Sequence, residues 1–405
     1  MTSIAQTTGS AAKPTESRLA GGLMARDHFL QIPTPGDHYS FTTGSAIMTL
    51  IYELARKHAA AGGQSTIVVG SGTRHDYPVG ECIEVGFKGL PSGWRKAVDI
   101  ALGRAGLPRI MSNAAYAPAR EAIDPEFEGH IFLQNAPGPI GMIKSHAPKA
   151  RVYLHAHNTL FKTYSDREVA DTVAAADLII CNCEFLANEI APRLHGRNSS
   201  KIRIFHNGVD TERFTPMPEM RDPEVVNILF VARMVPEKGA DLLIKAANKL
   251  TTKRKYKITI VGNQGFSATD PLSPYEIELR KLAAPLGDKI AFMPFIDRHQ
   301  ILPVYQAADI FCAPSNWNEP CTLTIPEAMS CGTPTIASRK GGIPEIAGDA
   351  VLYFDPPNTD QLAEQLTYLI DDDKARHDWG LSSRARAESL DWAIRYDVLR
   401  HVLKS

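Results

Sequence analysis

The chain has 405 residues, 44% of them apolar, and a formal net charge of −1 at pH 7. This length exceeds what one hydrophobic core usually serves, so we expect two domains. The near-neutral charge argues against a nucleic-acid-binding protein with a large basic excess, and no apolar run approaches the roughly 20 residues that a membrane-spanning helix needs.

Two features of the composition bear on compartment and cofactors. Residues 1–26 are rich in Ser, Thr, Ala and Gly and lack the continuous apolar core of a secretion signal, so we expect a disordered leader. The six cysteines form no C-x-x-C pair and several lie in apolar runs, which indicates free thiols in a reducing cytoplasm and no metal site. The acidic run 371–373 follows an apolar run and is interpreted as a solvated helix end.

Strands alternate with helical patterns along the first half of the chain, which is typical of βαβ units in a parallel sheet. A helix is expected from the loop at Gly44 to about His58. Gly44 would let backbone approach a phosphate, although a plain turn explains one glycine equally well. The strands expected in this half are 28–32, 65–70, 130–133, 151–154, 177–183 and 203–205.

The segment 87–120 is basic, with Asp99 as its one acid and Trp94 among the cations. Cations beside an amphipathic ring can rest on anionic lipid headgroups, where each contributes about 1 kcal/mol. A solvated helix face and a pocket for a phosphorylated acceptor explain the same composition, so three interpretations stay open. The cations are Lys88, Arg95, Lys96, Arg104, Arg109 and Arg120.

Two histidines follow the strand expected at 151–154. Alternation puts His155 and His157 on the same side of an extended chain, at the carboxyl end where open α/β sheets bind ligands. Metal binding would need further ligands, and none is near in sequence. His155 is interpreted as structural, whereas His157 either faces a ligand or is hydrogen-bonded inside the strand end.

The second half of the chain follows a tight turn at 206–210 and a proline-rich connection, which is typical of a domain boundary. Arg233 and Lys238 flank the first loop of this half, after the strand expected at 227–231 and before a helix at 241–250. Together they can stabilise the charge of a leaving diphosphate, while surface charge is the alternative for either residue alone. Further strands are expected at 257–261, 290–292, 308–313, 335–338 and 351–354.

Two carboxylates stand out in the stretch 313–345. Glu319 lies in a loop, and Glu327 lies in the first turn of a helix expected from Thr324 to Gly332, beside N–H groups that attract anions. Acids and N–H donors at the end of a parallel strand suit a ligand with hydroxyls and phosphates, such as a nucleotide sugar. Thr324 and Glu327 also fit a capping box, in which Glu327 would only satisfy a backbone donor.

The E-x7-E spacing of Glu319 and Glu327, with its neighbours, resembles the signature of the retaining GT-B glycosyltransferases of family 4. This resemblance covers about 44–405 and implies an α/β fold of the GT-B type: two Rossmann-like domains facing across a cleft, with a C-terminal helix crossing back to the first domain. The expected parts are a leader at 1–26, an acceptor-binding domain at 27–214, a nucleotide-sugar-binding domain at 215–385 and the crossover helix at 386–405.

The resemblance also implies a reaction: a hexose moves from a UDP- or GDP-sugar to a hydroxyl of a saccharide or lipid-linked saccharide, with retention, in envelope or exopolysaccharide synthesis. No cofactor or metal is implied, since cations and helix amides neutralise the diphosphate. The expected location is the cytoplasm, with a peripheral position at the inner face of the membrane as one option. An epimerase, a phosphorylase and a non-catalytic sugar-nucleotide sensor are the alternatives.

The same resemblance implies roles for individual residues. His157, Glu319, Lys238 and Arg233 are the expected catalytic residues. The expected donor-binding residues are Gly44, Arg233, Lys238, Thr322, Leu323, Thr324 and Glu327. Ala232, Pro294 and Thr322 stand where relatives usually have glycine; Pro294 lacks an N–H beside the base, which leaves the base open, and Thr322 adds bulk beside the sugar.

Overall fold

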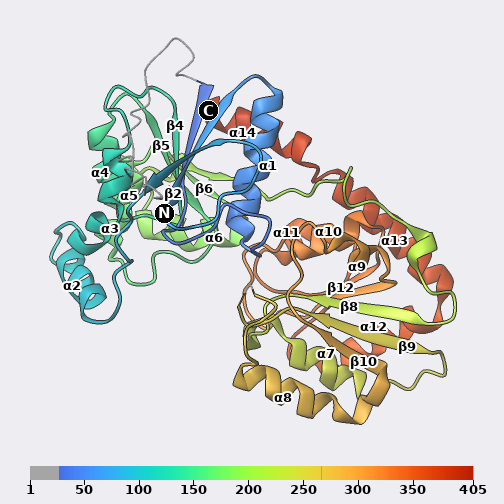
Figure 1. Ribbon diagram of the computed structural model, residues 1–405. Coiled ribbons are helices and arrows are strands. Elements are labelled where there is room, and N and C mark those ends of the chain that lie inside the picture. Colours follow the sequence, from blue (N-terminus) through green and yellow to red (C-terminus); the bar gives the residue numbers. More distant parts are fainter. Residues whose placement is uncertain (1–26, 266, 405) are drawn as a thin grey trace, which may run out of the picture.

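The computed structural model describes residues 27–265 and 267–404, so the leader expected at 1–26 lies outside the described residues. The first half forms a parallel sheet in the order β3-β2-β1-β4-β5-β6-β7 (Figure 1). Its strands are β1 (His28–Ile32), β2 (Gln64–Gly70), β3 (Glu81–Val85), β4 (His130–Gln134), β5 (Arg151–Ala156), β6 (Leu178–Cys181) and β7 (Ile202–Ile204). Its helices are α1 (Ala46–Ala60), α2 (Gly93–Arg104), α3 (Ile110–Glu121), α4 (Ile140–His146), α5 (Asp166–Ala175) and α6 (Glu184–Ile190).

The second half forms another parallel sheet, in the order β10-β9-β8-β11-β12-β13. Its strands are β8 (Val226–Val231), β9 (Tyr256–Val261), β10 (Ile290–Met293), β11 (Ile310–Ala313), β12 (Thr335–Ser338) and β13 (Leu352–Phe354). Its helices are α7 (Ala240–Ala247), α8 (Pro274–Ala283), α9 (Leu302–Gln306), α10 (Thr324–Ser330), α11 (Ile343–Ala347), α12 (Thr359–Asp371) and α13 (Asp373–Glu388), and α14 (Trp392–Lys404) ends the chain. The two parallel sheets confirm the predicted α/β class.

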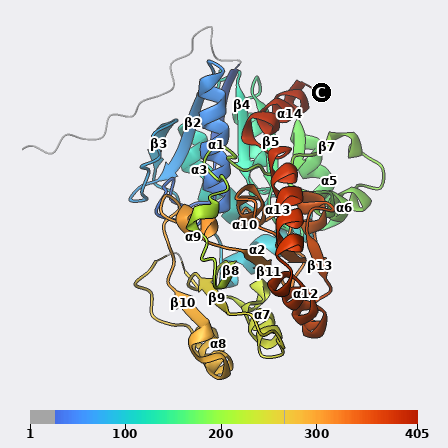
Figure 2. The same cartoon turned by 90° about the vertical axis from the view of Figure 1, so that its right-hand side faces the viewer.

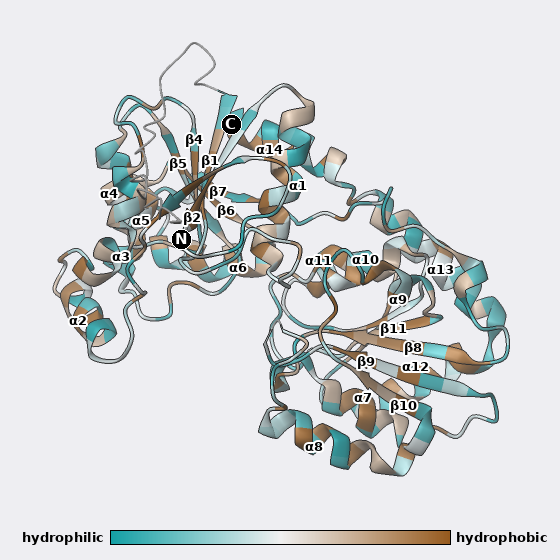
Figure 3. Cartoon of the chain, viewed as in Figure 1, coloured by the Kyte–Doolittle hydropathy of each residue, from teal (hydrophilic) through white to brown (hydrophobic). Residues whose placement is uncertain are grey.

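Each sheet is covered on both faces, which is why most of its strands are rich in buried apolar residues. In the first sheet, Leu30 and Ile131 pack with residues of α3 to α6, whereas Phe29 and Phe132 pack on the opposite face with α1 and α14. Figure 3 shows the same pattern as hydrophobic strands beneath helices that are hydrophilic on their outer sides. In the second sheet, Phe230 faces α7 and α12, and the neighbouring Leu229 faces α9 to α11.

Several elements were not predicted from the sequence. Among the described strands, β3 pairs only with β2, at the sheet edge, and Glu81 and Glu84 interrupt any apolar run in it. The helices α2 and α3 occupy the basic segment, for which a solvated helix face was one of three interpretations and no helix bounds were predicted. Within it, Arg109 is not a surface cation, because its guanidinium donates to Glu168 at 2.8 Å and stacks 3.6 Å from the centre of the Tyr164 ring. Asp99 is also buried and accepts from the amides of Met111 and Ser112 at the start of α3.

The end of the chain returns to the first domain (Figure 2). The expected boundary at 385 falls inside α13, and the helix that crosses back, α14, begins at Trp392. The Trp392 ring lies against Gly208, where an added Cβ would be 2.8 Å from ring atoms. The two domains also meet at α11. The carboxylate of Glu345 on this helix accepts from the amides of Glu184 and Phe185 at the start of α6.

Candidate active site

A cavity of about 380 Å³ lies between the two sheets and is lined by both halves of the chain. The expected catalytic and donor-binding residues all line it: Gly44, His157, Arg233, Lys238, Glu319, Thr322, Leu323, Thr324 and Glu327. They come from loops at the carboxyl ends of strands in both sheets, which is where open α/β sheets bind ligands. The cavity therefore brings together residues up to 283 positions apart, counted from Gly44 to Glu327.

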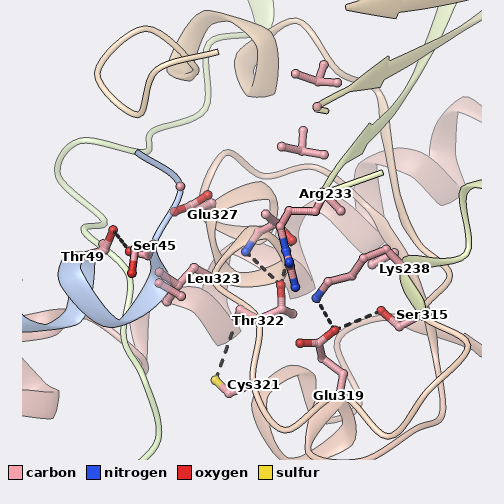
Figure 4. A pocket seen from close by; sticks show the side chains of 18 of the residues that line it. Ser45, Thr49, Arg233, Lys238, Ser315, Glu319, Cys321, Thr322, Leu323 and Glu327 are labelled. Carbon is pink, nitrogen blue, oxygen red and sulfur yellow. Dashed lines mark hydrogen bonds and ion pairs between the residues drawn. The ribbon is translucent and has the colours of Figure 1, made fainter. Parts of the chain in front are cut away.

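Glu319 is held by three side-chain donors. Its carboxylate forms an ion pair with Lys238 and accepts from Trp317 Nε1 at 2.9 Å and from Ser315 Oγ at 3.4 Å (Figure 4). The residue is only 4% exposed, so its charge depends on these partners. Its main chain lies against Gly341, where an added Cβ would be 2.3 Å from the Glu319 carbonyl oxygen and φ is 55°.

Lys238 reaches Glu319 because of the turn that follows it. Gly239 has a φ of 74°, in the left-handed region that favours glycine, and an added Cβ would be 1.9 Å from the carbonyl oxygen of Pro314. This close approach brings the loop 232–239 against the loop that carries Glu319. Arg233 lies at the other end of the loop and also lines the cavity, beside Thr322 in Figure 4.

Glu327 is held by a cation and a phenol. Its Oε1 accepts from Arg298 Nη1 at 2.5 Å, and its Oε2 accepts from the Tyr305 hydroxyl at 2.9 Å. The capping-box interpretation is wrong, because α10 begins at Thr324, has Leu323 at its N-cap and has no side-chain cap. Glu327 is thus a buried carboxylate that lines the cavity, and its side chain does not cap α10.

The Thr322–Thr324 segment differs from the expectation in one detail. The Thr324 amide donates to the Thr322 hydroxyl at 3.3 Å, and the two hydroxyls lie 2.9 Å apart. The amide of Thr324, one of the N–H groups expected to meet a diphosphate, therefore already has an internal partner. This partner is the Thr322 hydroxyl, which is present because a threonine stands where relatives usually have glycine.

The two histidines share the buried carboxyl end of β5. Their ring centroids lie 4.2 Å apart, and His157 Nε2 is 2.6 Å from Gln134 Oε1. Because that oxygen is an acceptor, the His157 ring carries its proton on Nε2 and its Nδ1 is an acceptor. Burial lowers the pKa of His157 to about 3 and holds the pKa of His155 well below its ordinary value. His157 is therefore neutral at physiological pH.

This shifted pKa predicts a pH dependence of stability. Between about pH 3 and 6.5 the unfolded chain binds a proton that folded His157 does not, so the free energy of unfolding falls as the pH is lowered. Urea unfolding at about pH 7.5 and 5.5 should show a loss in the wild type that is about 1.4 kcal/mol smaller in His157→Gln. An identical loss in both proteins would show that His157 titrates normally in the fold.

The sequence did not point to four further residues of the cavity. Arg298 and Tyr305 hold Glu327, yet they lie 29 and 22 residues before it in the chain. Asn182 and Asn207 follow β6 and β7, line the cavity and are nearly fully buried. Their side-chain oxygens have no hydrogen-bond partner among the residues that the structure describes. Asn207 stands in a turn that was interpreted only as a domain boundary.

The cavity is electrostatically divided. Among the described residues that line it, every Lys, Arg, Asp and Glu belongs to the second domain. The first domain contributes neutral polar groups, including Ser45, His157, Asn182 and Asn207. A charged ligand group therefore fits the second domain's side, and neutral hydroxyls fit the first domain's side.

Two family models, one for each half, together match most of the chain. The family described as Glycosyltransferase Family 4 matches residues 47–213, and the one described as Glycosyl transferases group 1 matches residues 218–386. The chain belongs to the group 1, family 4 glycosyltransferases. This membership agrees with the resemblance of the E-x7-E stretch.

Named relatives are similar over part of the chain. A D-inositol 3-phosphate glycosyltransferase of Mycobacterium sp. (strain JLS) is 32% identical over 197 residues, which are 47% of this chain and 43% of that protein. Spore coat protein SA of Bacillus subtilis (strain 168) is 27% identical over 278 residues, 64% of this chain and 73% of that protein. The chain matches only 43–60% of the length of several curated relatives.

Solved structures of glycosyltransferases share the fold. HepE of Anabaena, solved with UDP and glucose, has a TM-score of 0.69 at 18% identity and covers 93% of this chain and 99% of its own. Sucrose-phosphate synthase of Thermosynechococcus elongatus has a TM-score of 0.67 at 19% identity, over 94% of this chain and 98% of its own. These similarities confirm the GT-B architecture. None of the helices within the described ranges combines the length and apolarity needed to cross a bilayer.

Proposed function

We propose that the protein transfers a hexose from a nucleoside-diphosphate sugar to a hydroxyl group, with retention of the anomeric configuration. The observation that carries this proposal is the meeting of two buried carboxylates with Arg233 and Lys238 in one cavity between the domains. Cations suit the diphosphate, and carboxylates suit hydroxyls of the sugar and the ribose. Membership of the glycosyltransferase family supports the same reaction class.

In this proposal the bond between the sugar's anomeric carbon and the diphosphate oxygen breaks, and its electron pair leaves with the diphosphate. Arg233 and Lys238 line the second-domain side, where they would stabilise the growing negative charge. The acceptor hydroxyl's oxygen then bonds to the anomeric carbon on the same face, and the hydroxyl's proton passes to the leaving diphosphate oxygen. Lys238 is already oriented by its ion pair with Glu319, so the sugar-binding and diphosphate-binding groups act as one unit.

The hydroxyls of the donor would be bound from both domains. Glu319 would accept from sugar hydroxyls and Glu327 from the ribose. Asn182, Asn207 and His157 line the first-domain wall, and the side-chain oxygens of both asparagines lack a hydrogen-bond partner among the described residues. Buried acceptors without donors are costly, and sugar hydroxyls would satisfy them.

The donor we propose is a UDP- or GDP-sugar. HepE, which shares the fold, was solved with UDP and with UDP-glucose, and this favours UDP for the first trial. A thermal-shift panel of UDP, GDP, ADP and their glucose or mannose derivatives should give a rise in melting temperature with one base only. No rise with any of them would contradict a nucleotide-sugar site.

The reaction class can be separated from the alternatives by product analysis. Incubation with the stabilising donor and a saccharide acceptor, followed by NMR of the new glycosidic linkage, should show the donor's anomeric configuration in the product. Phosphate-dependent release of a sugar 1-phosphate would instead indicate a phosphorylase. An isomerised sugar without transfer would indicate an epimerase, and binding without turnover would indicate a sensor.

The acceptor we propose is a saccharide, free or lipid-linked, in polysaccharide assembly at the inner membrane face. The hairpin of α2 and α3 supports membrane contact, because four large apolar side chains are exposed on it: Leu90, Trp94, Leu107 and Ile110. Trp94 is 71% exposed. Lys88, Lys96 and Arg104 are exposed beside them, so this surface matches an anionic bilayer in both polarity and charge.

Vesicle flotation tests this surface. We expect the wild type to float with vesicles rich in phosphatidylglycerol and to remain behind with neutral ones. Trp94→Ser should weaken flotation by about tenfold, because the substitution removes the large indole that would be buried at the bilayer interface. Leu381→Ser, an exposed leucine on α13, is the matched control and should float normally. Equal flotation with anionic and neutral vesicles would remove the membrane proposal.

A further inference from the structure

Arg298 lines the cavity but belongs to none of the family segments that the sequence singled out. It stands between β10 and α9, in a segment that also carries Phe295 and Ile296 into the cavity lining. Its guanidinium donates to Glu327 Oε1 at 2.5 Å, and the two side chains are 14% and 4% exposed. The pair is thus a nearly buried ion pair inside the cleft.

The main chain of Arg298 is fixed independently of that ion pair. Its amide donates to the carbonyl oxygen of Phe41 at 3.1 Å, and its own carbonyl oxygen accepts from the Arg213 guanidinium. Phe41 belongs to the loop of the first domain that leads to Gly44. Both the amide and the carbonyl group of Arg298 are therefore hydrogen-bonded, independently of the bond between its side chain and Glu327.

The geometry leaves part of Glu327 open. An ionised carboxylate has about four lone-pair positions on two oxygens. Arg298 occupies one on Oε1, and the Tyr305 hydroxyl occupies one on Oε2. Counting donors from the described part of the chain, one position on each oxygen remains, which matches two adjacent hydroxyl donors on a ring. The vicinal 2′- and 3′-hydroxyls of a ribose have this arrangement.

We propose that Arg298 is a positioning residue for the nucleoside: it fixes the Glu327 carboxylate so that its two remaining acceptor positions meet the ribose 2′- and 3′-hydroxyls. This inference rests on the proposed nucleotide-sugar site. Arg298 orients an acceptor and does not itself bind the ribose. A carboxylate without this donor would be buried with an unmatched charge and free to rotate away.

The test compares ribose recognition with and without Arg298. Calorimetry would measure the Kd of UDP and of 2′,3′-dideoxy-UDP for the wild type, Arg298→Gln and Arg298→Lys. In the wild type, UDP should bind at least about tenfold tighter than the dideoxy analogue, as expected for hydroxyls donating to a charged acceptor. In Arg298→Gln that ratio should fall to within about twofold of one. Arg298→Lys keeps the charge and should recover part of the ratio.

Arg221→Gln is the matched control, because Arg221 is also a partly buried arginine of the second domain but donates to the carbonyl oxygens of Cys331 and Gly332, away from the cavity. It should keep the wild-type ratio even if it lowers the melting temperature. An unchanged ratio in Arg298→Gln would overturn the inference, and so would tighter UDP binding, which would mean that Arg298 competes with the ribose.

These outcomes are distinct from failure of the proposed function. If the wild type binds GDP or ADP in place of UDP, the same comparison uses the dideoxy form of that nucleotide. If it binds none of the three, the nucleotide-sugar site is wrong and this inference falls with it. Steady-state kinetics adds a readout that lost folding would not give, namely a raised donor KM with kcat retained at saturation.

Discussion

Lys238→Ala should lower kcat for sugar transfer by about 100- to 1000-fold. The ammonium group lies in the donor cavity beside Glu319, where it would stabilise the leaving diphosphate, and removal of one such preorganised charge typically has an effect of this size. Lys238→Arg should restore part of the rate, since the charge remains. The measurement is steady-state transfer with the donor identified by the thermal-shift panel.

Lys245→Ala is the control for this experiment. Lys245 lies on α7 in the same domain, is 48% exposed and pairs with Asp241 on the helix surface, outside the cavity. Its replacement should leave the transfer rate within about twofold of the wild type, because exposed ion pairs contribute little. Equal rates for Lys238→Ala and Lys245→Ala would show that Lys238 has no part in catalysis.

Trp392→Ala should lower the free energy of unfolding of the first domain by about 3–5 kcal/mol. Trp392 opens α14, is 1% exposed and packs in the same cluster as Phe29 and Phe205. Its main-chain amide also donates to the carbonyl oxygen of Val209 at 3.1 Å. The cavity left by the indole would loosen the one helix that ties the end of the chain to the first domain. Urea unfolding monitored by far-UV circular dichroism measures the change, because this signal reports backbone structure and does not rely on tryptophan fluorescence.

The neighbouring residue Ile394 provides the comparison. It lies on the same helix and is 48% exposed, so Ile394→Ala should change the free energy of unfolding by less than about 0.5 kcal/mol. If both variants lost the same small amount, α14 would not be packed as described. A change in the urea m-value of Trp392→Ala would indicate that α14 detaches before the rest unfolds.

Much of the fold could be predicted because parallel strands are buried on both faces. Apolar side chains therefore predominate in the runs at 28–32 and 227–231, and all four residues of 335–338 are buried, which makes these strands easy to recognise. The cavity residues could be predicted for a related reason. Loops at the carboxyl ends of parallel strands meet at one edge, so Arg233, Lys238 and Glu319 converge although 81 residues separate Lys238 from Glu319.

The rest of the site could not be predicted, because it depends on contacts between residues that are far apart in the sequence. The capping-box alternative rested on the spacing of Thr324 and Glu327 alone, but Arg298 and Tyr305 approach Glu327 from a distant segment and donate to its oxygens. Arg109 was grouped with the other cations of the basic segment 87–120, for which lipid contact, a solvated helix face and a pocket stayed open. The fold instead buries it against Tyr164 and Glu168, residues more than 50 positions away.

The central claim is that cations of the second domain bind the diphosphate of a nucleotide sugar in the cleft. Calorimetry with UDP, UMP and uridine, or the corresponding series for the base that the panel selects, tests it most directly. We predict that the diphosphate binds at least about tenfold tighter than the monophosphate in the wild type, and that Lys238→Ala removes most of this difference. Equal affinity for diphosphate and monophosphate in the wild type, or an unchanged difference in Lys238→Ala, would contradict the claim.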